Sequence, residues 1–252
     1  FIIAGRPSMG KTAFALSIAG QLVNDGIPSV LFSLEMSARS IMYRLISLLG
    51  KIELKKLFEA KNLSDNDFNE IENSLSLLSR SKFFIDDTSS LSPSEILSRS
   101  RKLKRENPDL GLIIIDYMQL MQADTKNDNR VSEMSEISRS LKALAKEIDV
   151  PVIALSQLNR APETRTGKRP VLADLKDSGA IEQDADIVTF VFRAEKYEQD
   201  LENKGLAIID VAKHRNGPTG SVKLHFSDKY TKFQDLAPDD PALRNPDFSE
   251  ED

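Results

Sequence analysis

The sequence contains no cysteine. Disulfide bonds and thiolate metal sites are therefore excluded, and the composition fits a reducing compartment such as the cytoplasm. No apolar run approaches the ~18–20 residues that a membrane-spanning helix needs, and the start of the chain has no signal-peptide pattern. We therefore expect a cytoplasmic protein that has no membrane partner.

An excess of positive charge is also missing, because the net charge is −5 and the isoelectric point is near 5.3. Any contact with nucleic acid must therefore come from a local basic stripe. The 252 residues suffice for one large α/β domain, and 29% charged and 40% hydrophobic residues are typical of a globular protein. Only four residues precede Gly5, too few for a complete first strand with its lead-in. We therefore expect a fragment of a longer protein.

A glycine-rich motif stands near the start of the chain. It fits the P-loop pattern G-x-x-x-x-G-K-[ST] and consists of Gly5, Arg6, Pro7, Ser8, Met9, Gly10, Lys11 and Thr12. The two glycines let backbone N–H groups point at phosphate oxygens. Lys11 would reach the β- and γ-phosphates, and the Thr12 hydroxyl would bind Mg²⁺. An apolar strand over residues 1–4 and a helix over residues 13–23, with Gly26 at its end, flank the motif as it requires.

Strands and helices alternate along the rest of the chain, which predicts an α/β fold with a mostly parallel sheet covered by helices on both faces. A turn at residues 227–229 predicts an antiparallel hairpin at the C-terminal end. We expect strands over residues 30–34, 83–86, 112–116, 152–155, 187–192, 207–212, 222–226 and 230–233, and helices over residues 38–49, 53–60, 64–79, 92–106 and 131–148. Residues 1–236 would form one ATPase domain, and residues 237–252 an acidic, disordered tail.

Three polar residues follow apolar strands and are candidates for chemistry. Asp116 ends the run Leu112–Ile115 in the Walker B pattern, so we expect it to bind Mg²⁺ directly or through water. Glu35 ends the second strand, where it could orient and deprotonate water or simply begin a helix. Gln157 could sense a γ-phosphate by one hydrogen bond, or could be an ordinary loop residue; its own position does not decide.

Two basic segments occur late in the chain. Lys213 and Arg215 are two residues apart before a turn, which suits an arginine finger delivered to a neighbouring subunit or an ordinary solvated tip. Residues 174–180 follow a basic loop at 159–170. Lys176 and the small residues beside it could grip a phosphodiester backbone, or could form a solvated loop. No aromatic residue occurs in residues 174–180, so base stacking is not predicted there.

Taken together, six motifs resemble those of the bacterial replicative DNA helicases of the DnaB type, over the chain up to about residue 236. The P-loop alone would indicate only an NTPase. The other five motifs are Ser33-Leu34-Glu35-Met36, Ile115-Asp116-Tyr117-Met118-Gln119-Leu120-Met121, Ser156-Gln157-Leu158-Asn159-Arg160, the segment Ser178–Asp186, and Lys213-His214-Arg215-Asn216-Gly217-Pro218-Thr219-Gly220.

The resemblance implies a RecA-like core that assembles into a homohexameric ring, with ATP between subunits and single-stranded DNA in the channel. By motif it assigns water activation to Glu35 and γ-phosphate sensing to Gln157. Lys213 and Arg215 would reach the next subunit's site. The DNA backbone would be bound by Lys176, Asp177 and Gly179. It also implies a helicase loader and primase as partners, primase through an N-terminal domain that is absent here. His214 stands where many relatives have glutamine.

We therefore expect an ATP- and Mg²⁺-dependent helicase motor that moves 5′ to 3′ on single-stranded DNA; the polarity comes from the resemblance. The alternative is a RecA-like regulatory ATPase switch that unwinds nothing. A small-molecule kinase is a weaker alternative, because no lid segment or acceptor pocket is recognisable between Glu35 and Asp116.

Overall fold

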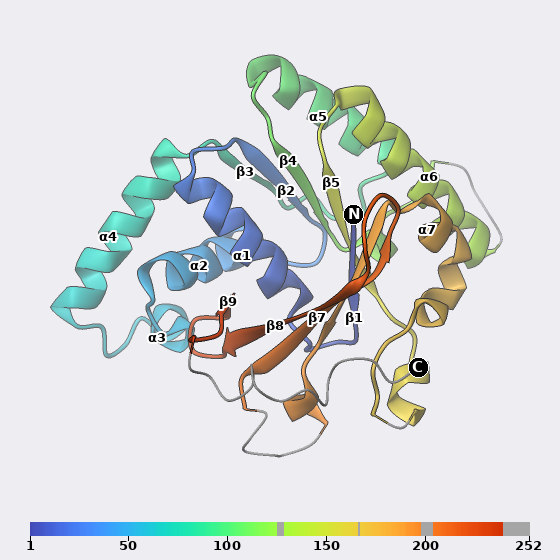
Figure 1. Cartoon of the computed structure of the whole chain (residues 1–252). Coiled ribbons are helices and arrows are strands. Elements are labelled where there is room, and N and C mark those ends of the chain that lie inside the picture. Colours follow the sequence, from blue (N-terminus) through green and yellow to red (C-terminus); the bar gives the residue numbers. More distant parts are fainter. Residues whose placement is uncertain (125–128, 166, 198–203, 239–252) are drawn as a thin grey trace.

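A nine-stranded sheet forms the centre of the computed structural model (Figure 1). The structure describes residues 1–124, 129–165, 167–197 and 204–238. Within them the strand order is β3-β2-β4-β5-β1-β6-β7-β8-β9; the strands from β3 to β6 run parallel, and the last three pair antiparallel. The strands are β1 (Ile2–Gly5), β2 (Ser29–Ser33), β3 (Phe83–Asp86), β4 (Leu112–Asp116), β5 (Val152–Gln157), β6 (Ile187–Phe192), β7 (Leu206–His214), β8 (Gly220–Ser227) and β9 (Lys232–Asp235).

Helices cover both faces of this sheet (Figure 1). One face carries α1 (Lys11–Asn24), α2 (Ala38–Gly50), α3 (Leu54–Glu59) and α4 (Asp65–Arg80). The other carries α5 (Pro93–Glu106), α6 (Arg130–Ile148) and α7 (Gly179–Asp184). Short 3₁₀ turns are η1 (Met118–Leu120), η2 (Ala161–Thr164), η3 (Leu172–Ser178) and η4 (Ala194–Lys196). The predicted fold class is confirmed: a mostly parallel sheet flanked by helices, with an antiparallel C-terminal extension.

Two buried layers hold the helices to the sheet. Ile113 and Ile115 of β4 pack on the α5–α7 side, whereas Ile114 packs on the α1–α4 side, and all three are fully buried. A parallel strand that is covered on both faces needs apolar residues at every position, since successive side chains point to opposite faces. The unbroken apolar run in β4 follows from this requirement.

The predicted helix starts are confirmed where capping residues mark them. Ser92 accepts a hydrogen bond from the backbone N–H of Glu95, and the Glu95 carboxylate accepts one from the N–H of Ser92. Pro93 then occupies the first turn, where a missing N–H costs nothing. No helix within the described residues is long and apolar enough to span a membrane.

Three strands are longer than predicted, and one of them is β8, which spans Gly220–Ser227 instead of residues 222–226. β5 extends from residue 155 to Gln157, because Gly5 of β1 pairs with Gln157 and continues the parallel ladder. β7 extends through Lys213 to His214, because these residues pair with Val188 and Ile187 at the start of β6. The sheet partners, rather than local sequence, decide where these strands end.

Residues 174–180, predicted as a loop, instead belong to η3 and α7. Ile181 and Ala185 are buried in the layer that includes α6, so tertiary packing stabilises a helix too short to form alone. The predicted disordered tail over residues 237–252 lies outside the described residues from residue 239 onward.

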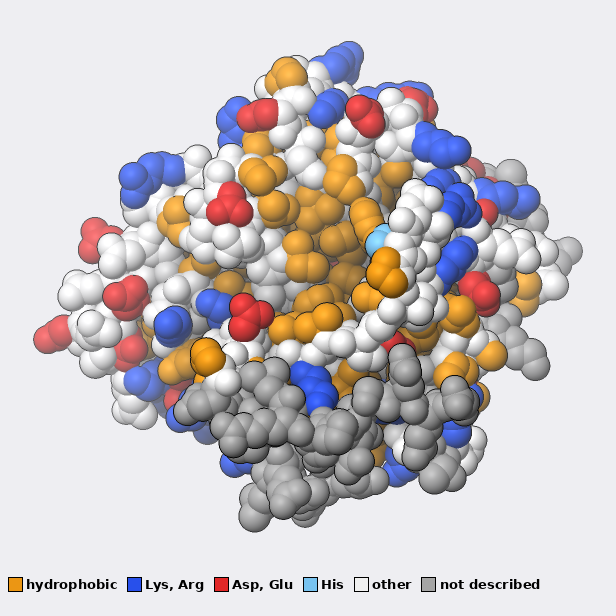
Figure 2. Space-filling model, in the orientation of Figure 1, with side chains coloured by type: hydrophobic (Ala, Val, Ile, Leu, Met, Phe, Trp, Pro, Cys, Tyr) orange, Lys and Arg blue, Asp and Glu red, His pale blue; other side chains and the backbone are white. Residues whose placement is uncertain are grey.

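One face of the molecule has an apolar centre (Figure 2). Apolar side chains fill the middle of this face, between α1 and the β7–β8 hairpin, and charged side chains lie around it. On the hairpin, Ile209 pairs with Val222, and Val222 is 54% exposed. Contiguous apolar surface of this kind marks an interaction site more often than a solvated face.

Candidate active site

The carboxyl ends of four adjacent strands bring the predicted site residues together. In the order β2-β4-β5-β1, the residues at or just beyond these ends are Glu35, Asp116, Gln157 and Gly5. Ser33 of β2 pairs with Asp116, and Gly5 pairs with Gln157, so the four ends are level. Ligands of open α/β sheets bind outside such carboxyl ends, where the strand connections diverge.

Backbone conformation opens the P-loop toward this edge. Gly10 has a φ of 98° and precedes the first turn of α1 without a side-chain cap. The positive φ favours glycine, and a Cβ atom at Gly10 would also crowd the ring of Phe233, at 3.1 Å. The uncapped N–H groups of α1 and the positive end of the helix dipole are available to an anion.

A cavity of about 580 Å³ lies above the P-loop. This volume is in the range of small-molecule sites. The predicted residues that line it are Pro7, Ser8, Gly10, Lys11, Thr12, Glu35, Asp116 and Gln157. Three predicted P-loop residues, Gly5, Arg6 and Met9, are not among the lining residues. Met9 is buried in the core, and the side chain of Arg6 binds residues beyond β5.

Thr12 and Asp116 meet at the base of the cavity. The Thr12 hydroxyl donates a hydrogen bond to Oδ2 of Asp116 at 2.8 Å. Asp116 is only 2% exposed, and burial raises its pKa to about 6, with Glu35 acting in the same direction and the Thr12 hydrogen bond and Lys11 in the opposite one. The Asp116–Tyr117 peptide bond is cis.

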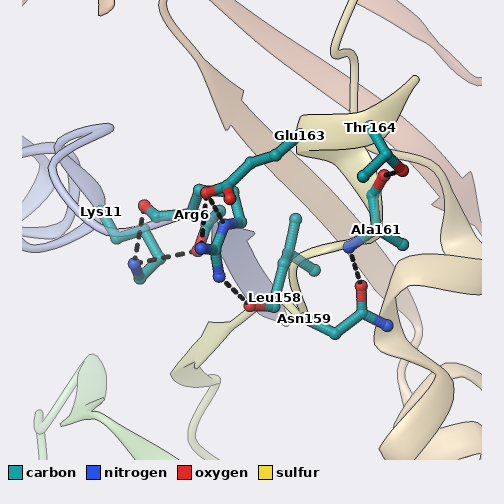
Figure 3. Close-up of polar contacts among 8 residues, drawn as sticks. Arg6, Lys11, Leu158, Asn159, Ala161, Glu163 and Thr164 are labelled. Carbon is teal, nitrogen blue, oxygen red and sulfur yellow. Dashed lines mark hydrogen bonds and ion pairs between the residues drawn. The ribbon is translucent and has the colours of Figure 1, made fainter.

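Lys11 is held back on its own loop (Figure 3). Its Nζ donates hydrogen bonds to the carbonyl oxygens of Gly5 at 3.0 Å and Arg6 at 3.2 Å. Burial lowers the pKa of Lys11 to about 8, whereas Asp116 and Glu35 act to raise it. A partly buried ammonium group with only neutral acceptors is a favourable site for an added negative charge.

These residues fit a nucleoside triphosphate with Mg²⁺. Buried Asp116 has no ion-pair partner within the described part of the chain, and the N-terminal end of α1 has no capping side chain. No group of three or more His, Asp or Glu residues that could hold a metal alone occurs among the described residues. That combination suits a cation that shares its ligands between Thr12, Asp116 and phosphate oxygens.

Gln157 is fixed through its backbone by Gln119 of η1. The Gln119 amide donates to the Gln157 carbonyl at 3.0 Å, and the Gln119 side-chain oxygen accepts from the Gln157 N–H at 3.2 Å. Gln119 also donates to the hydroxyl of Ser156. The Gln157 side chain is exposed at the cavity, which leaves its amide available to a ligand.

Lys213 and Arg215 do not line the cavity of their own subunit. Lys213 Nζ donates to the carbonyl oxygen of Glu182 at 2.5 Å, and Arg215 Nη2 donates to that of Gln183 at 3.1 Å. Arg215 also forms an ion pair with Asp186 at 3.4 Å. Both cations therefore contact the C-terminal end of α7 and the residues next to it.

The three predicted DNA-binding residues fall in η3 and at the start of α7. Lys176 and Asp177 belong to η3, and Gly179 begins α7. Their side chains lie outside the described part of the structure, so the predicted contacts stay predictions.

Sequence reasoning missed two arginines in the cavity wall. Arg44 of α2 lines the cavity, and its buried Nε has no hydrogen-bond partner in the described residues. Arg193 follows β6, pairs with Asp228 at 2.9 Å and lies 3.8 Å over the Phe226 ring. The signal that could have found them is a lone arginine in or after an otherwise apolar stretch, at residues 41–46 and 187–193.

The fold and the site define a P-loop domain of the α/β class. The chain belongs to the DnaB-like helicase C-terminal domain family, whose model matches residues 1–235. It is 47% identical over 238 residues to the replicative DNA helicase DnaB of Haemophilus influenzae. That match covers 94% of this chain and 51% of the relative, so the chain spans about half the length of that protein.

Solved structures agree with this family. One solved ATPase domain matches with a TM-score of 0.90 and 42% identity, over 94% of this chain and 84% of that one. A DnaB-like replicative helicase, solved in a study of its interactions with primase, also matches with a TM-score of 0.90 and 42% identity, over 94% and 57%. The RadB recombinase, at 17% identity and a TM-score of 0.55 over 94% and 90%, shares the fold alone. The predicted RecA-like fold is confirmed.

Proposed function

We propose that this chain is the motor domain of a replicative DNA helicase. In this proposal it hydrolyses ATP at the interfaces of a homohexamer, moves 5′ to 3′ on single-stranded DNA and unwinds duplex. Family membership and the relative in Haemophilus influenzae support the helicase assignment. The observation that carries the nucleotide chemistry is the single cavity shared by the P-loop, Glu35, Asp116 and Gln157.

Each residue of the cavity has a proposed task. Lys11 and the N–H groups of α1 bind phosphate oxygens, while Thr12 and Asp116 hold Mg²⁺. A Mg²⁺ ion held by Thr12 and Asp116 would supply positive charge that offsets the negative charge of the phosphates. Glu35 orients the attacking water and accepts its proton, and Gln157 hydrogen-bonds the γ-phosphate. Arg193 and Phe226 also line the cavity, where the Arg193 guanidinium lies 3.8 Å over the Phe226 ring.

The proposed site is completed by a second copy of the chain. Lys213 and Arg215 do not line the cavity of their own subunit. They occupy the end of β7 and the turn after it, on the hairpin whose apolar face includes the exposed Val222. This placement supports delivery of both cations to a neighbouring nucleotide, as in arginine-finger enzymes. For the whole protein we propose single-stranded DNA, a helicase loader and primase as further partners.

The proposal is tested with duplex DNA that carries one single-stranded tail, either a 5′ tail or a 3′ tail, and each such substrate is called a fork here. We expect ATP hydrolysis that single-stranded DNA stimulates, and opening of forks with a 5′ tail but not of forks with a 3′ tail. Lys11→Ala serves as the inactive control, because it removes the phosphate-binding cation. Opening of the 3′-tailed fork alone would contradict the proposed polarity.

The alternative function is a regulatory ATPase switch. It predicts ATP-dependent assembly and ATP hydrolysis with no fork opening and no dependence of hydrolysis on single-stranded DNA. Measurement of mass in solution, with and without ATP and DNA, separates an assembly switch from a chain that fails to bind nucleotide at all.

A further inference from the structure

Arg6 belongs to the P-loop, but it does not line the cavity. Its side chain points toward Glu163 and Leu158 (Figure 3). Its Nε and Nη2 donate to Oε1 of Glu163 at 2.8 and 2.5 Å, and its Nη1 donates to the carbonyl oxygen of Leu158 at 2.8 Å. The guanidinium group thus contacts two points of the segment that follows β5. Glu163 lies in η2, 157 residues further along the chain.

Burial distinguishes this ion pair from an ordinary surface pair. The Arg6 side chain is 11% exposed and the Glu163 side chain 41%. Exposed pairs contribute little because water screens them and two long side chains must be ordered. Here the guanidinium is largely shielded and uses three of its nitrogens at once, a geometry that lysine cannot reproduce.

The backbone of Arg6 contacts the proposed catalytic lysine. Lys11 Nζ donates to the carbonyl oxygens of Gly5 and Arg6. Arg6 therefore holds Lys11 through its carbonyl oxygen and the η2 segment through its side chain. Release of Lys11 from these two carbonyls to an anion would change the hydrogen bonding of the residue that anchors η2.

Beyond Glu163, polar contacts continue to η3. Arg165 pairs with Asp174 through Nη1 and Nη2, each at 3.0 Å. Asp174 is buried and also accepts from the backbone N–H of Val171 at 2.7 Å. Asp174 lies in η3, the 3₁₀ turn that contains the proposed DNA-binding residues Lys176 and Asp177.

We propose that Arg6 is a positioning residue that links the nucleotide site to the DNA-binding segment of the same subunit, through its bridge to Glu163. The proposal rests on the proposed function, since it needs both ligands to bind. In this proposal the bridge makes nucleotide binding and DNA binding depend on each other. It does not set the affinity for either ligand alone. By reciprocity, nucleotide changes DNA affinity by the same factor as DNA changes nucleotide affinity.

The element with two states is Lys11 with the loop that holds it. In one state Lys11 is bonded to the carbonyls of Gly5 and Arg6, and in the other it is bonded to an anion in the cavity. A ligand shifts such an equilibrium only by its differential affinity for the two states. With the bridge intact, the arrangement of η2 and η3 is more stable in one of the two states of Lys11 than in the other. Without the bridge, nucleotide and DNA bind to their two sites independently.

Glu163→Gln tests the proposal, because it removes the charge of the bridge while its partner in the P-loop stays. The probe is a fluorescent, non-hydrolysable ATP analogue with Mg²⁺, titrated with and without a single-stranded oligothymidine. We expect the DNA-induced change in nucleotide Kd, on the order of 5-fold or more in the unsubstituted chain, to fall toward one. The nucleotide Kd without DNA stays unchanged. Glu72→Gln, an exposed residue of α4, is the matched control and keeps the full linkage.

A double-mutant cycle with Arg6→Gln completes the test. If the bridge carries the linkage, the double variant loses no more linkage than either single variant. Full linkage in Glu163→Gln, additive losses in the cycle, or no linkage in an unsubstituted chain that binds both ligands overturns this inference alone. An unsubstituted chain that binds neither nucleotide nor DNA overturns the proposed function instead.

Discussion

Asp116 and Thr12 show how much of the proposed chemistry depends on one hydrogen bond. Their 2.8 Å contact joins the end of β4 to the start of α1, two elements about a hundred residues apart in sequence. The carboxylate is buried, and its only short contact to a charged or hydroxyl side chain within the described residues is Thr12. Because burial disfavours the charged form, the Asp116 carboxylate is stabilised as an anion mainly by the groups or ions that bind to it.

Asp116→Asn retains size and hydrogen bonding but removes the charge. We expect ATP hydrolysis to fall by on the order of 100-fold or more, as when one stabilising group is lost from a preorganised site. The thermal unfolding temperature should change little, because the variant buries no new charge. Steady-state phosphate release at several Mg²⁺ concentrations measures the loss. Asp86→Asn is the control, because this carboxylate ends the edge strand β3 and pairs with Arg99 at 2.5 Å. Equal losses in both variants would argue against a metal role.

Arg215 provides the second prediction at this scale. Arg215→Ala should reduce hydrolysis by roughly 10³-fold, the low end for an arginine finger, and leave nucleotide binding intact. Because the finger acts on the next subunit, mixing Arg215→Ala with Lys11→Ala subunits should recover activity at interfaces that combine an intact Lys11 with an intact Arg215. Hydrolysis is measured as a function of the mixing ratio. No recovery at any ratio, or normal hydrolysis by Arg215→Ala alone, would show that the finger assignment is wrong.

Among the secondary-structure elements, β9 and α1 depend on one another through aromatic packing. The Phe233 ring meets Phe14 edge-on at 5.2 Å and Phe226 at 4.7 Å between centroids. The backbone N–H of Phe233 also donates to the Ser17 hydroxyl at 3.1 Å. The same ring lies against Gly10, so the last described strand supports the phosphate-binding loop.

Phe233→Ala should lower the free energy of unfolding by about 3–5 kcal/mol, since it leaves a cavity in a buried cluster. Nucleotide binding should weaken as well, because the ring no longer backs the P-loop. Denaturant unfolding and nucleotide titration measure the two effects. Phe68→Ala, at a ring that is 56% exposed on α4, should stay within about 0.5 kcal/mol of the unsubstituted chain.

The start of α4 has a pH-dependent cap. Hydrogen bonds from the Ser64 backbone N–H, from Lys56 and from the Ser64 hydroxyl lower the pKa of Asp67. A carboxyl group with a depressed folded-state pKa stabilises the fold above its unfolded pKa of about 3.9, and this contribution is lost as the pH falls through the lower folded value.

Asp67→Asn should therefore be less stable than the unsubstituted chain at neutral pH, and the difference should shrink as the pH falls below about 3.9. Denaturant midpoints across this range measure it. Asp65→Asn, an exposed carboxylate in the same first turn, is the control and should show a smaller pH-dependent difference. If the stability difference between Asp67→Asn and the unsubstituted chain stayed the same in acid, the shape of the side chain and not its charge would stabilise the start of α4.

For the whole molecule, charge and assembly decide how the site is used. With a net charge of −5, the chain has no general attraction for DNA, so affinity depends on a local segment. The apolar centre of one face and the placement of Lys213 and Arg215 outside their own cavity both favour a neighbouring subunit. The proposed contacts to nucleotide, DNA and the neighbouring subunit would then all come from the same domain, through the P-loop, η3 with α7, and the β7–β8 hairpin.

Lys176→Ala separates the helicase from the regulatory switch. We expect weaker binding to single-stranded DNA of any sequence, and a log–log salt dependence whose slope falls in magnitude by about one, because one phosphate contact is lost. Lys61→Ala, an exposed lysine between α3 and α4, should leave the slope unchanged. Fluorescence anisotropy over a range of salt concentrations measures both. An unchanged slope in Lys176→Ala would favour the switch.

The sequence by itself determined the P-loop, most helices and strands, and the polar residues that stand at or just after the apolar runs of three parallel strands. These features depend on short-range physics: glycine conformation, capping residues such as Ser92 and Glu95, and apolar runs such as Leu112–Ile115. Because parallel strands present their carboxyl ends at one edge, strand-end positions already implied that Glu35, Asp116 and Gln157 lie near the P-loop.

Only the tertiary structure decided which side chains meet across long sequence separations. The ends of β5 and β7, the helix α7 and the cavity positions of Arg44 and Arg193 all depend on partners far along the chain. The same holds for the direction of the Arg6 side chain, which contacts Glu163 and Leu158. The direction of a long side chain depends on its packing surroundings, and no local pattern in the sequence records them.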